Sequence, residues 1–305
     1  MLRLLILGGT GFVSGHLARM AREMGHEVWC VTRGQRKPAE GARLLQADRN
    51  DERQLLHALE SAGTRFDAAL DCICFDGKQA GIDLNVLPRF TRQAVVISTD
   101  SVYDPFHKRV PQDEESDFYM RDGGYGCKKR EMEEAFLAYD GSLRWTLLRP
   151  GHILGAGSEP GCFPEHSRQR DLLTYMRQDR LLRLVGGGKY LIHPIYVEDL
   201  CRAMLACIGN PACEDQIFCI GGPDIVENAR YYEMIGEIIG QPARIESIPE
   251  EGYLAAHPEY SGHLCHRAYS LEKLKNAGVP LPDTPLREAI RRHIQWLDER
   301  ENTKN

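Results

Sequence analysis

Short apolar runs alternate with amphipathic segments through the first half of the chain. Residues 4–7 form an apolar run that ends in glycines, and Leu17, Met20, Ala21 and Met24 then recur every three or four positions. The run predicts a buried strand, and the spacing predicts a helix that follows it directly. The same patterns predict further strands at 27–32, 43–48, 67–75, 94–98 and 144–149, and helices at 51–59 and 125–139.

Strands that alternate with helices predict an α/β fold with a doubly wound parallel sheet. After residue 155 the alternation loosens, beginning with a stretch rich in Gly and Pro at 156–164. We therefore expect a sheet domain over 1–155 and a smaller C-terminal α/β domain, which would bind the substrate, over 156–305. Segment 191–220 is expected to return to the first sheet. The predicted later elements are strands at 191–196, 216–220 and 243–248, and helices at 197–208 and 286–299.

The composition is that of a globular protein without a strong charge. Of the 305 residues, 42% are hydrophobic and 27% are charged, and the net charge is −6. A negative chain gives no reason to expect nucleic acid or an anionic membrane as a partner. No apolar run reaches the roughly 18 residues of a membrane span, and the first run is too short for a signal peptide. We expect a cytoplasmic location.

The ten cysteines form no Cys-x-x-Cys pair, and several lie in apolar runs, where cysteine packs as a small hydrophobe. Two groups contain potential metal ligands, Cys162 with His166 and Cys265 with His263 and His266. Neither group completes a set of four ligands at a familiar spacing. We therefore expect no metal site and reduced thiols.

The turn after the first strand carries the first candidate chemistry. Its small residues are spaced Gly8-x-x-Gly11-x-x-Ser14, between a strand and the N-terminus of a helix. Such a turn lets a pyrophosphate approach the backbone and meet the free N–H groups of the helix. A tight turn without a ligand is the alternative interpretation. The predicted dinucleotide contacts here are Gly8, Thr10, Gly11, Phe12 and Val13.

The end of the second strand bears on the choice of dinucleotide. An acidic residue there usually accepts the ribose 2′-hydroxyl of NAD(H), but this chain has a threonine followed by Arg33. A guanidinium can bind a 2′-phosphate through two hydrogen bonds, so we predict NADP(H), with NAD(H) as the alternative. Arg36 or Lys37 would assist, unless Arg33 is simply a solvated loop residue. Asp48, with Arg49 beside it, ends the third strand, where the adenine edge would lie.

A hydroxyl, a phenol and an ammonium group follow later in the chain. Thr99 directly follows the fifth strand, at the edge where open α/β sheets bind ligands. Tyr125 and Lys129 lie four apart on one face of a predicted helix. A nearby ammonium favours the phenolate, so Tyr125 can exchange a proton with a substrate hydroxyl whose oxygen Thr99 holds. Tyr269 and Lys273 have the same spacing but lie far beyond the sheet, and we interpret them as an ordinary C-terminal segment.

These segments together resemble the extended short-chain dehydrogenases/reductases, the family of NAD(P)-dependent sugar epimerases and dehydratases, whose sheet domain is of the Rossmann type. The resemblance covers nearly the whole chain. It rests on Gly8 to Val13, Ser98 to Tyr103, Tyr125 with Lys129, Arg149-Pro150-Gly151 and Tyr196 to Asp199.

The resemblance implies roles for single residues. Tyr125 would be the general acid/base, Lys129 would bind the nicotinamide ribose and tune Tyr125, and Thr99 would orient the reacting oxygen. Asp100 matches an acid of the sugar-nucleotide 4,6-dehydratases and of the 4-keto-sugar reductases. In the dehydratases a glutamate follows that acid, whereas this chain has Ser101, so the segment is more similar to the reductases.

Two departures from the family pattern concern the substrate. Nucleotide-sugar members usually carry Asn where this chain has His152, and often an arginine for the diphosphate near Ile192. A smaller polyol, a sugar phosphate or another carbonyl compound is therefore about as well supported as a nucleotide sugar. His152 and His193 are candidate substrate contacts, or else histidines whose hydrogen bonds are satisfied within the protein.

We predict an NADP(H)-dependent oxidoreductase that transfers hydride at a carbonyl or secondary alcohol of a sugar-like substrate. The alternatives are an epimerase or dehydratase with tightly held NAD(P), and a non-catalytic NADP-sensing or RNA-associated protein on the same fold. The family also implies a homodimer formed through the helix that bears Tyr125. There, Met132, Phe136 and Leu137 fit either an interface or packing on the sheet.

Overall fold

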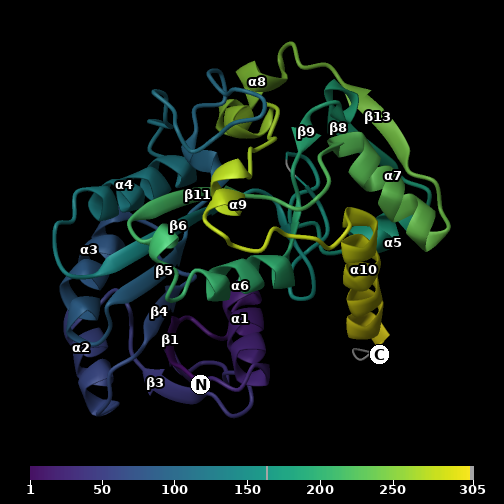
Figure 1. The fold of residues 1–305 in the computed structure, drawn as a ribbon. Helices are drawn as coiled ribbons and strands as arrows, with labels where there is room; N and C mark the ends of the chain where they lie inside the picture. The colour runs from purple at the N-terminus through teal and green to yellow at the C-terminus, as the bar shows by residue number, and fades with distance from the viewer. Residues whose placement is uncertain (163, 303–305) are drawn as a thin grey trace.

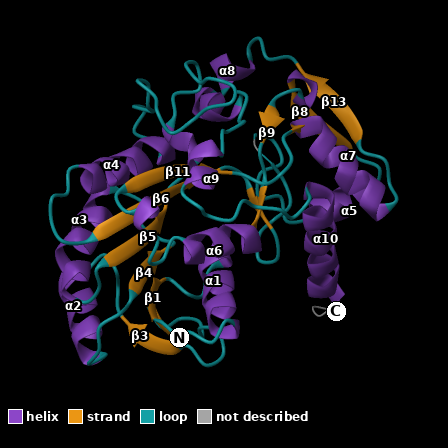
Figure 2. Cartoon of the chain, viewed as in Figure 1, coloured by secondary structure: helices purple, strands orange, loops and turns teal. Residues whose placement is uncertain are grey.

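A parallel sheet forms the centre of the molecule, with helices on both of its faces (Figures 1 and 2). The computed structural model describes residues 1–162 and 164–302. In these ranges seven strands form the sheet in the order β11-β6-β5-β4-β1-β2-β3, and all neighbouring pairs are parallel. The strands are β1 (Arg3–Leu7), β2 (Glu27–Thr32), β3 (Arg43–Gln46), β4 (Ala68–Asp71), β5 (Gln93–Ile97), β6 (Arg144–Pro150) and β11 (Gln216–Ile220). The strand order reverses between β1 and β4, which confirms the predicted doubly wound sheet of the Rossmann type.

Each face of the sheet has its own hydrophobic core. Leu4 and Ile6 of β1 enter one core and Leu5 and Leu7 enter the other, because successive side chains of a strand point to opposite faces. The first core is covered by α1 (Phe12–Glu23) and α6 (Val197–Ala206), and the second by α2 (Glu52–Ser61), α3 (Gly77–Val86) and α4 (Tyr125–Leu137). Within the described ranges, no helix has the length and apolar character that a bilayer span requires.

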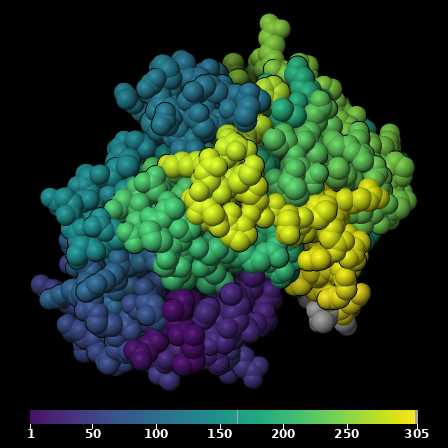
Figure 3. Space-filling view, viewed as in Figure 1, coloured from purple at the N-terminus to yellow at the C-terminus, as the bar shows by residue number. Residues whose placement is uncertain are grey.

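The chain beyond β6 forms a smaller α/β part beside the sheet, and two of its elements return to the sheet. β11 pairs with β6, and α6 packs beside α1. In the space-filling view the C-terminal residues (yellow) lie across the middle of the molecule, against the green and teal segments (Figure 3). The short strands of this part are β7 (Ile153–Leu154), β8 (Leu181–Val185), β9 (Leu191–Ile192), β10 (Ile195–Tyr196), β12 (Val226–Glu227) and β13 (Arg244–Ile248). Its helices are α5 (Leu172–Arg177), α7 (Asn228–Ile239), α8 (Tyr253–Ala256), α9 (Glu272–Asn276) and α10 (Leu286–Asn302).

Besides elements of the C-terminal part such as β8, which the patterns do not predict, three segments differ from the prediction. The fourth strand ends at Asp71 rather than at residue 75, because the Asp71 carboxylate accepts the N–H of Ile73 at 2.6 Å and the chain turns there. The patterns do not predict α3, which contains two glycines and is capped by Asp76. The strand expected over 191–196 is interrupted by His193-Pro194. Its two halves, β9 and β10, pair with β12 and β7 respectively.

Candidate functional site

A cavity of about 530 Å³ opens at the carboxyl ends of β1 to β4. The turn after β1, the ends of β2 and β3, and the segment after β4 contribute to its wall. The predicted cofactor contacts that line it are Gly8, Thr10, Gly11, Arg33, Asp48 and Arg49. Phe12 and Val13, at the start of α1, pack against the hydrophobic core. The volume is in the range of cofactor sites.

The backbone after β1 is shaped for close approach. Gly9 has φ +98°, and a Cβ at this position would lie 2.5 Å from the Cys30 sulfur. Ser14, the third position of the turn, is 2% exposed, and its hydroxyl accepts the Gly11 N–H at 3.1 Å. The turn therefore exposes backbone N–H groups without side chains, together with the N-terminus of α1, to the cavity, where they would stabilise a pyrophosphate.

The end of the cavity near β2 carries positive side chains. Arg33 and Arg36 are exposed and both line the cavity. Asp48 lines it as well, and its carboxylate accepts two hydrogen bonds from Asn50, each of 2.9 Å. The residue that closes β2 is Thr32, so the end of this strand presents a hydroxyl to the cavity where a carboxylate would accept a ribose hydroxyl.

The guanidinium of Arg49 is engaged within the protein. It donates to Asp83 at 2.6 Å and to the carbonyl of Ile73 at 2.9 Å, and it lies 3.1 Å from Asp71. Burial and the neighbouring Asp71 raise the pKa of Asp83 well above its usual range. Asp71, Cys74 and Asp83 have ligand atoms within 4.8 Å of one another, but the guanidinium of Arg49 already pairs with both carboxyl groups. The side chain of Arg49 thus supports the cavity wall from behind.

The structure brings Tyr125 and Thr99 together. Tyr125 is the first residue of α4, and a Cβ on the following Gly126 would lie 2.0 Å from the carbonyl oxygen of Ser101. The helix therefore approaches the segment after β5 more closely than any other residue at 126 would allow. Tyr125 is 54% exposed, yet burial around its hydroxyl raises its pKa, while a hydrogen bond with Thr99 lowers it in part. The Thr99 hydroxyl also accepts the N–H of Ser101 at 3.2 Å.

Lys129 lies one turn further along α4 and is 1% exposed. Its ammonium donates to the carbonyls of Cys74 and Ile97, at 2.6 and 2.7 Å, and lies 5.2 Å from the ring centre of Phe75, which lines the cavity. Burial lowers the pKa of Lys129, and nearby carboxylates, that of Glu133 among them, offset part of this effect. Two of its three protons are therefore used by the backbone, and the third remains for a ligand.

Asp100 is held by residues that sequence reasoning missed. Both of its carboxylate oxygens accept from Arg267, at 2.5 and 2.8 Å, and Tyr269 donates to it at 2.6 Å. Lys108 donates in turn to the Tyr269 hydroxyl at 3.3 Å. Burial alone would raise the pKa of Asp100, but Arg267 and Lys108 outweigh it and lower the pKa to about 2. Tyr269, interpreted from the sequence as part of an ordinary C-terminal segment, thus contacts the residue that follows Thr99.

The two candidate histidines have different surroundings. His193 is 4% exposed; one ring nitrogen donates to the carbonyl of Gly222 at 2.7 Å and the other accepts the N–H of Tyr269 at 3.2 Å, so its hydrogen bonds are satisfied. His152 lines a small cavity of about 30 Å³ together with Arg267. Within the described part of the chain its Nε2 is buried without a partner, and burial and Arg267 lower its pKa to about 4. Of the two, His152 remains available to a substrate.

Comparisons with known proteins agree with this geometry. A family model described as the NAD dependent epimerase/dehydratase family matches residues 4–221. The chloroplast stem-loop binding protein of 41 kDa b from Arabidopsis thaliana is 24% identical over 239 residues, which are 73% of this chain and 60% of that protein. This chain therefore spans less than two thirds of that relative.

A bacterial enzyme and a solved structure are also similar. The 2′-dehydrokanamycin reductase of Streptomyces kanamyceticus is 22% identical over 262 residues, which cover 82% of this chain and 70% of that enzyme. The structure of dTDP-glucose 4,6-dehydratase from Bacillus anthracis in complex with NAD has a TM-score of 0.80 at 17% identity and covers 99% of this chain and 98% of that one. At this identity the structural likeness establishes the fold. Because the family model covers more than half of the chain and includes Thr99, Tyr125 and Lys129, the chain belongs to the NAD-dependent epimerase/dehydratase family of enzymes.

Proposed function

We propose that this protein is an NADP(H)-dependent oxidoreductase that transfers hydride at a carbonyl or secondary alcohol of a sugar-like substrate. The observation that carries the proposal is the hydrogen bond between Tyr125 and Thr99, with Lys129 one turn further along α4 and its ammonium near Phe75, which lines a cavity that suits a dinucleotide. The similarity to a reductase supports the same reaction class.

The residues present fit a dinucleotide. The turn at Gly8 to Gly11 would hold the pyrophosphate, Asp48 would meet the adenine, and the free proton of Lys129 would meet the nicotinamide ribose. Arg33 and Arg36 would bind a 2′-phosphate, which supports NADP(H) over NAD(H). When bound, the nicotinamide supplies or accepts the hydride.

The residues of the chain would handle the proton. The Thr99 hydroxyl holds the substrate oxygen, and the Tyr125 hydroxyl gives a proton to it during reduction or takes one during oxidation. Burial raises the pKa of Tyr125, and the hydrogen bond with Thr99 and the charges of Arg168 and Arg267 oppose this effect and favour the tyrosinate form, to which the charge of Lys129 would add. His152, whose Nε2 is buried in the small cavity, would bind a further hydroxyl of the substrate.

The state of Asp100 favours a reductase or an epimerase over a dehydratase. Elimination of water needs an acid that protonates the leaving hydroxyl. Asp100 is ionised at neutral pH because Arg267 and its hydrogen bonds lower its pKa to about 2, and Ser101 follows it in place of a second acid. These two residues therefore argue against elimination at this site.

The first test measures the choice of cofactor. In the Arg33→Ala variant we expect the dissociation constant of NADPH to rise about 10- to 100-fold, because a charge-assisted hydrogen bond is lost, while that of NADH stays unchanged. Arg53→Ala, on an exposed face of α2, is the matched control. Equal binding of NADPH by the wild type and the Arg33→Ala variant would contradict the role given to Arg33.

The second test measures the role of Tyr125. NADPH oxidation is screened against keto sugars and aldoses, and the variants are assayed on whichever substrate the wild type reduces. Tyr125→Phe should lower kcat about 10²- to 10⁴-fold and leave the NADPH dissociation constant unchanged. Tyr175→Phe, whose hydroxyl donates to Leu181 away from the cavity, should behave as the wild type. Full turnover by Tyr125→Phe would refute the mechanism.

The retained nucleotide separates this proposal from its alternatives. An epimerase returns the hydride, so its cofactor need not leave, and denatured protein would release NAD(P) at near-full occupancy. A reductase exchanges cofactor in each cycle and would be purified largely empty. The similarity to a chloroplast stem-loop binding protein supports an RNA-associated protein as a further candidate, and this candidate predicts NADPH binding without any turnover.

The proposal includes a homodimer. Met132 and Phe136 are fully buried in the core beneath α4, which leaves Leu137, 50% exposed, as the apolar residue of the three that an interface could use. Light scattering on the purified protein would measure a mass of twice 34.5 kDa if the dimer forms.

A further inference from the structure

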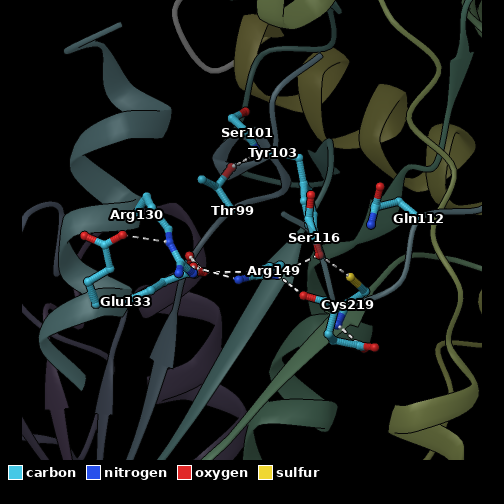
Figure 4. A network of polar contacts seen from close by, with 12 residues as sticks. Thr99, Ser101, Tyr103, Gln112, Ser116, Arg130, Glu133, Arg149 and Cys219 are labelled. Carbon is cyan, nitrogen blue, oxygen red and sulfur yellow. Dashed lines mark hydrogen bonds and ion pairs between the residues drawn. The ribbon is translucent and has the colours of Figure 1, made fainter. Parts of the chain in front are cut away.

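A buried polar network joins α4 to the segment that carries Thr99 (Figure 4). Glu133 is four residues after Lys129 and eight after Tyr125, so the three side chains share one stripe of α4. Both Glu133 and Arg149 are 0% exposed. A buried charge pair at the base of the catalytic stripe calls for an explanation beyond packing.

The carboxylate of Glu133 joins the helix to two strands. One oxygen accepts from the hydroxyl of Ser98 at 2.6 Å and from Arg149 Nε at 2.8 Å, and the other accepts from Arg149 Nη2 at 2.8 Å and from Arg130 at 3.1 Å. Ser98 directly precedes Thr99, and its N–H donates to the carbonyl of Leu148 in β6 at 2.7 Å. The end of β5 is thus fixed to β6 by its backbone and to α4 at two points: the Ile97 carbonyl accepts from Lys129, and the next residue, Ser98, donates its hydroxyl to Glu133.

Arg149 extends the same network to the loop beyond β5. Its Nη1 donates to the Tyr103 hydroxyl at 2.7 Å and to the carbonyl of Glu114 at 2.9 Å. Its guanidinium carbon also lies 4.8 Å from the ring centre of Tyr103. The segments on both sides of Thr99, Ser98 before it and Tyr103 after it, are therefore held by one ion pair.

Stability alone does not account for this arrangement. Burial would raise the pKa of Glu133, but Arg149 outweighs it and keeps the carboxylate ionised. Removing two charges from water costs so much that apolar residues of similar volume often hold elements together equally well. The ion pair instead fixes the geometry, because each of its hydrogen bonds sets the distance between two elements.

We propose that Glu133, anchored by Arg149, is a positioning residue: it holds Ser98, and with it Thr99, at a fixed distance from the stripe of α4 that carries Tyr125 and Lys129. The inference rests on the proposed roles of Tyr125 and Thr99. Displacements of about 1 Å between such groups can lower a rate about 100-fold. A rigid link between Glu133 and Ser98 would therefore protect the rate of the reaction.

The test removes the link and spares the ion pair. Ser98→Ala deletes one hydroxyl and leaves Glu133 bound to Arg149. Thr146→Val is the matched control, because Thr146 is also fully buried in the sheet and its hydroxyl also makes one hydrogen bond, of 2.7 Å, to the carbonyl of Cys213. Tyr125 is titrated by NMR in protein labelled with ¹³C at the tyrosine ring, and its signal is assigned by its loss in Tyr125→Phe.

Ser98→Ala should raise the pKa of Tyr125 by about 0.5–1 pH unit, because Thr99 is then less well aligned with the Tyr125 hydroxyl. The hydrogen bond between these two groups, which lowers this pKa, becomes weaker. Thr146→Val should leave the titration unchanged although both variants lose thermal stability. An unchanged titration in Ser98→Ala, or an equal shift in both variants, would overturn the inference. The readout needs neither cofactor nor substrate, so failure of the proposed reaction is detected separately, as absence of NADPH-dependent turnover.

Discussion

Asp100 couples the stability of the protein to pH. Its pKa lies near 2 in the folded protein and at 3.8 for an unperturbed side chain, so the folded state gains stability from the ionised form. This contribution is fully present above the unperturbed value and is lost as pH falls through about 2. The difference amounts to about 2 kcal/mol. Asp100→Asn should therefore be less stable than the wild type by at least about this amount at pH 7, since it also leaves Arg267 without a counter-charge.

Urea unfolding at pH 7 and at pH 2 measures this effect. The difference between wild type and Asp100→Asn should shrink at pH 2, where the wild type begins to protonate the same carboxyl. Asp298→Asn is the control, because its ion pair with Arg177 is about 40% exposed and should contribute less than about 1 kcal/mol. A difference that is the same at both pH values would mean that Asp100 does not titrate as described.

The residues of the site differ in how far the sequence reveals them. Thr99, Tyr125 and Lys129 are found because a strand end and a spacing of four are local features. Arg267 lies 167 residues from Asp100, and nothing near it in the chain indicates its partner. The sequence therefore suggests Asp100 as an acid, whereas its distant partners make it a fixed anion.

At the scale of elements, the ion cluster of Arg49, Asp71 and Asp83 joins the end of β3 to β4 and α3. Burial and the charge of Asp71 raise the pKa of Asp83, so the folded state binds this proton more tightly than the unfolded state does. Stability from the protonated form is fully present at low pH and is lost as pH rises through the folded value. Replacing Asp83 by asparagine, its neutral isostere, should remove this loss of stability at higher pH.

Asp83→Asn should thus be more stable than the wild type at pH 8, and the gain should diminish toward pH 4. Thermal unfolding over this pH range measures it. Arg49→Met provides the opposite case, because it leaves the buried Asp71 and Asp83 without their cation and should cost about 3–5 kcal/mol. A destabilised Asp83→Asn at pH 8 would mean that Asp83 is ionised and needed by Arg49.

The same region marks where element prediction failed. β2 and β11 begin and end at the predicted residues, because their apolar runs are bounded by polar ones. α3 escaped prediction since its glycines weaken the helical pattern, and the segment after β4 continued to look like a strand. The tertiary contacts of Arg49 with the Ile73 carbonyl fix that segment in place, and these contacts leave no periodic signal.

At the scale of the whole molecule, the sheet is completed by residues far along the chain. The edge of β6 is paired by β11, and the core over α1 is covered by α6. A fragment that ends at residue 155 lacks both elements, so it would expose an unpaired strand and an uncovered apolar face. A fragment that ends at residue 224 contains both, although it lacks Arg267.

We therefore expect residues 1–155 not to fold alone and residues 1–224 to unfold cooperatively on heating. Circular dichroism melts and NADPH binding compare the two fragments directly. Because the cavity is built entirely from residues up to 79, the longer fragment should bind NADPH. It should lack turnover, because Arg267 and Tyr269 are absent and Asp100 loses the partners that hold it beside Thr99. A cooperative transition in residues 1–155 would instead mean that the six strands up to β6 are stable without β11 and α6. The return of the chain to the sheet would then serve the substrate-binding part and would not be needed to fold the cofactor-binding part.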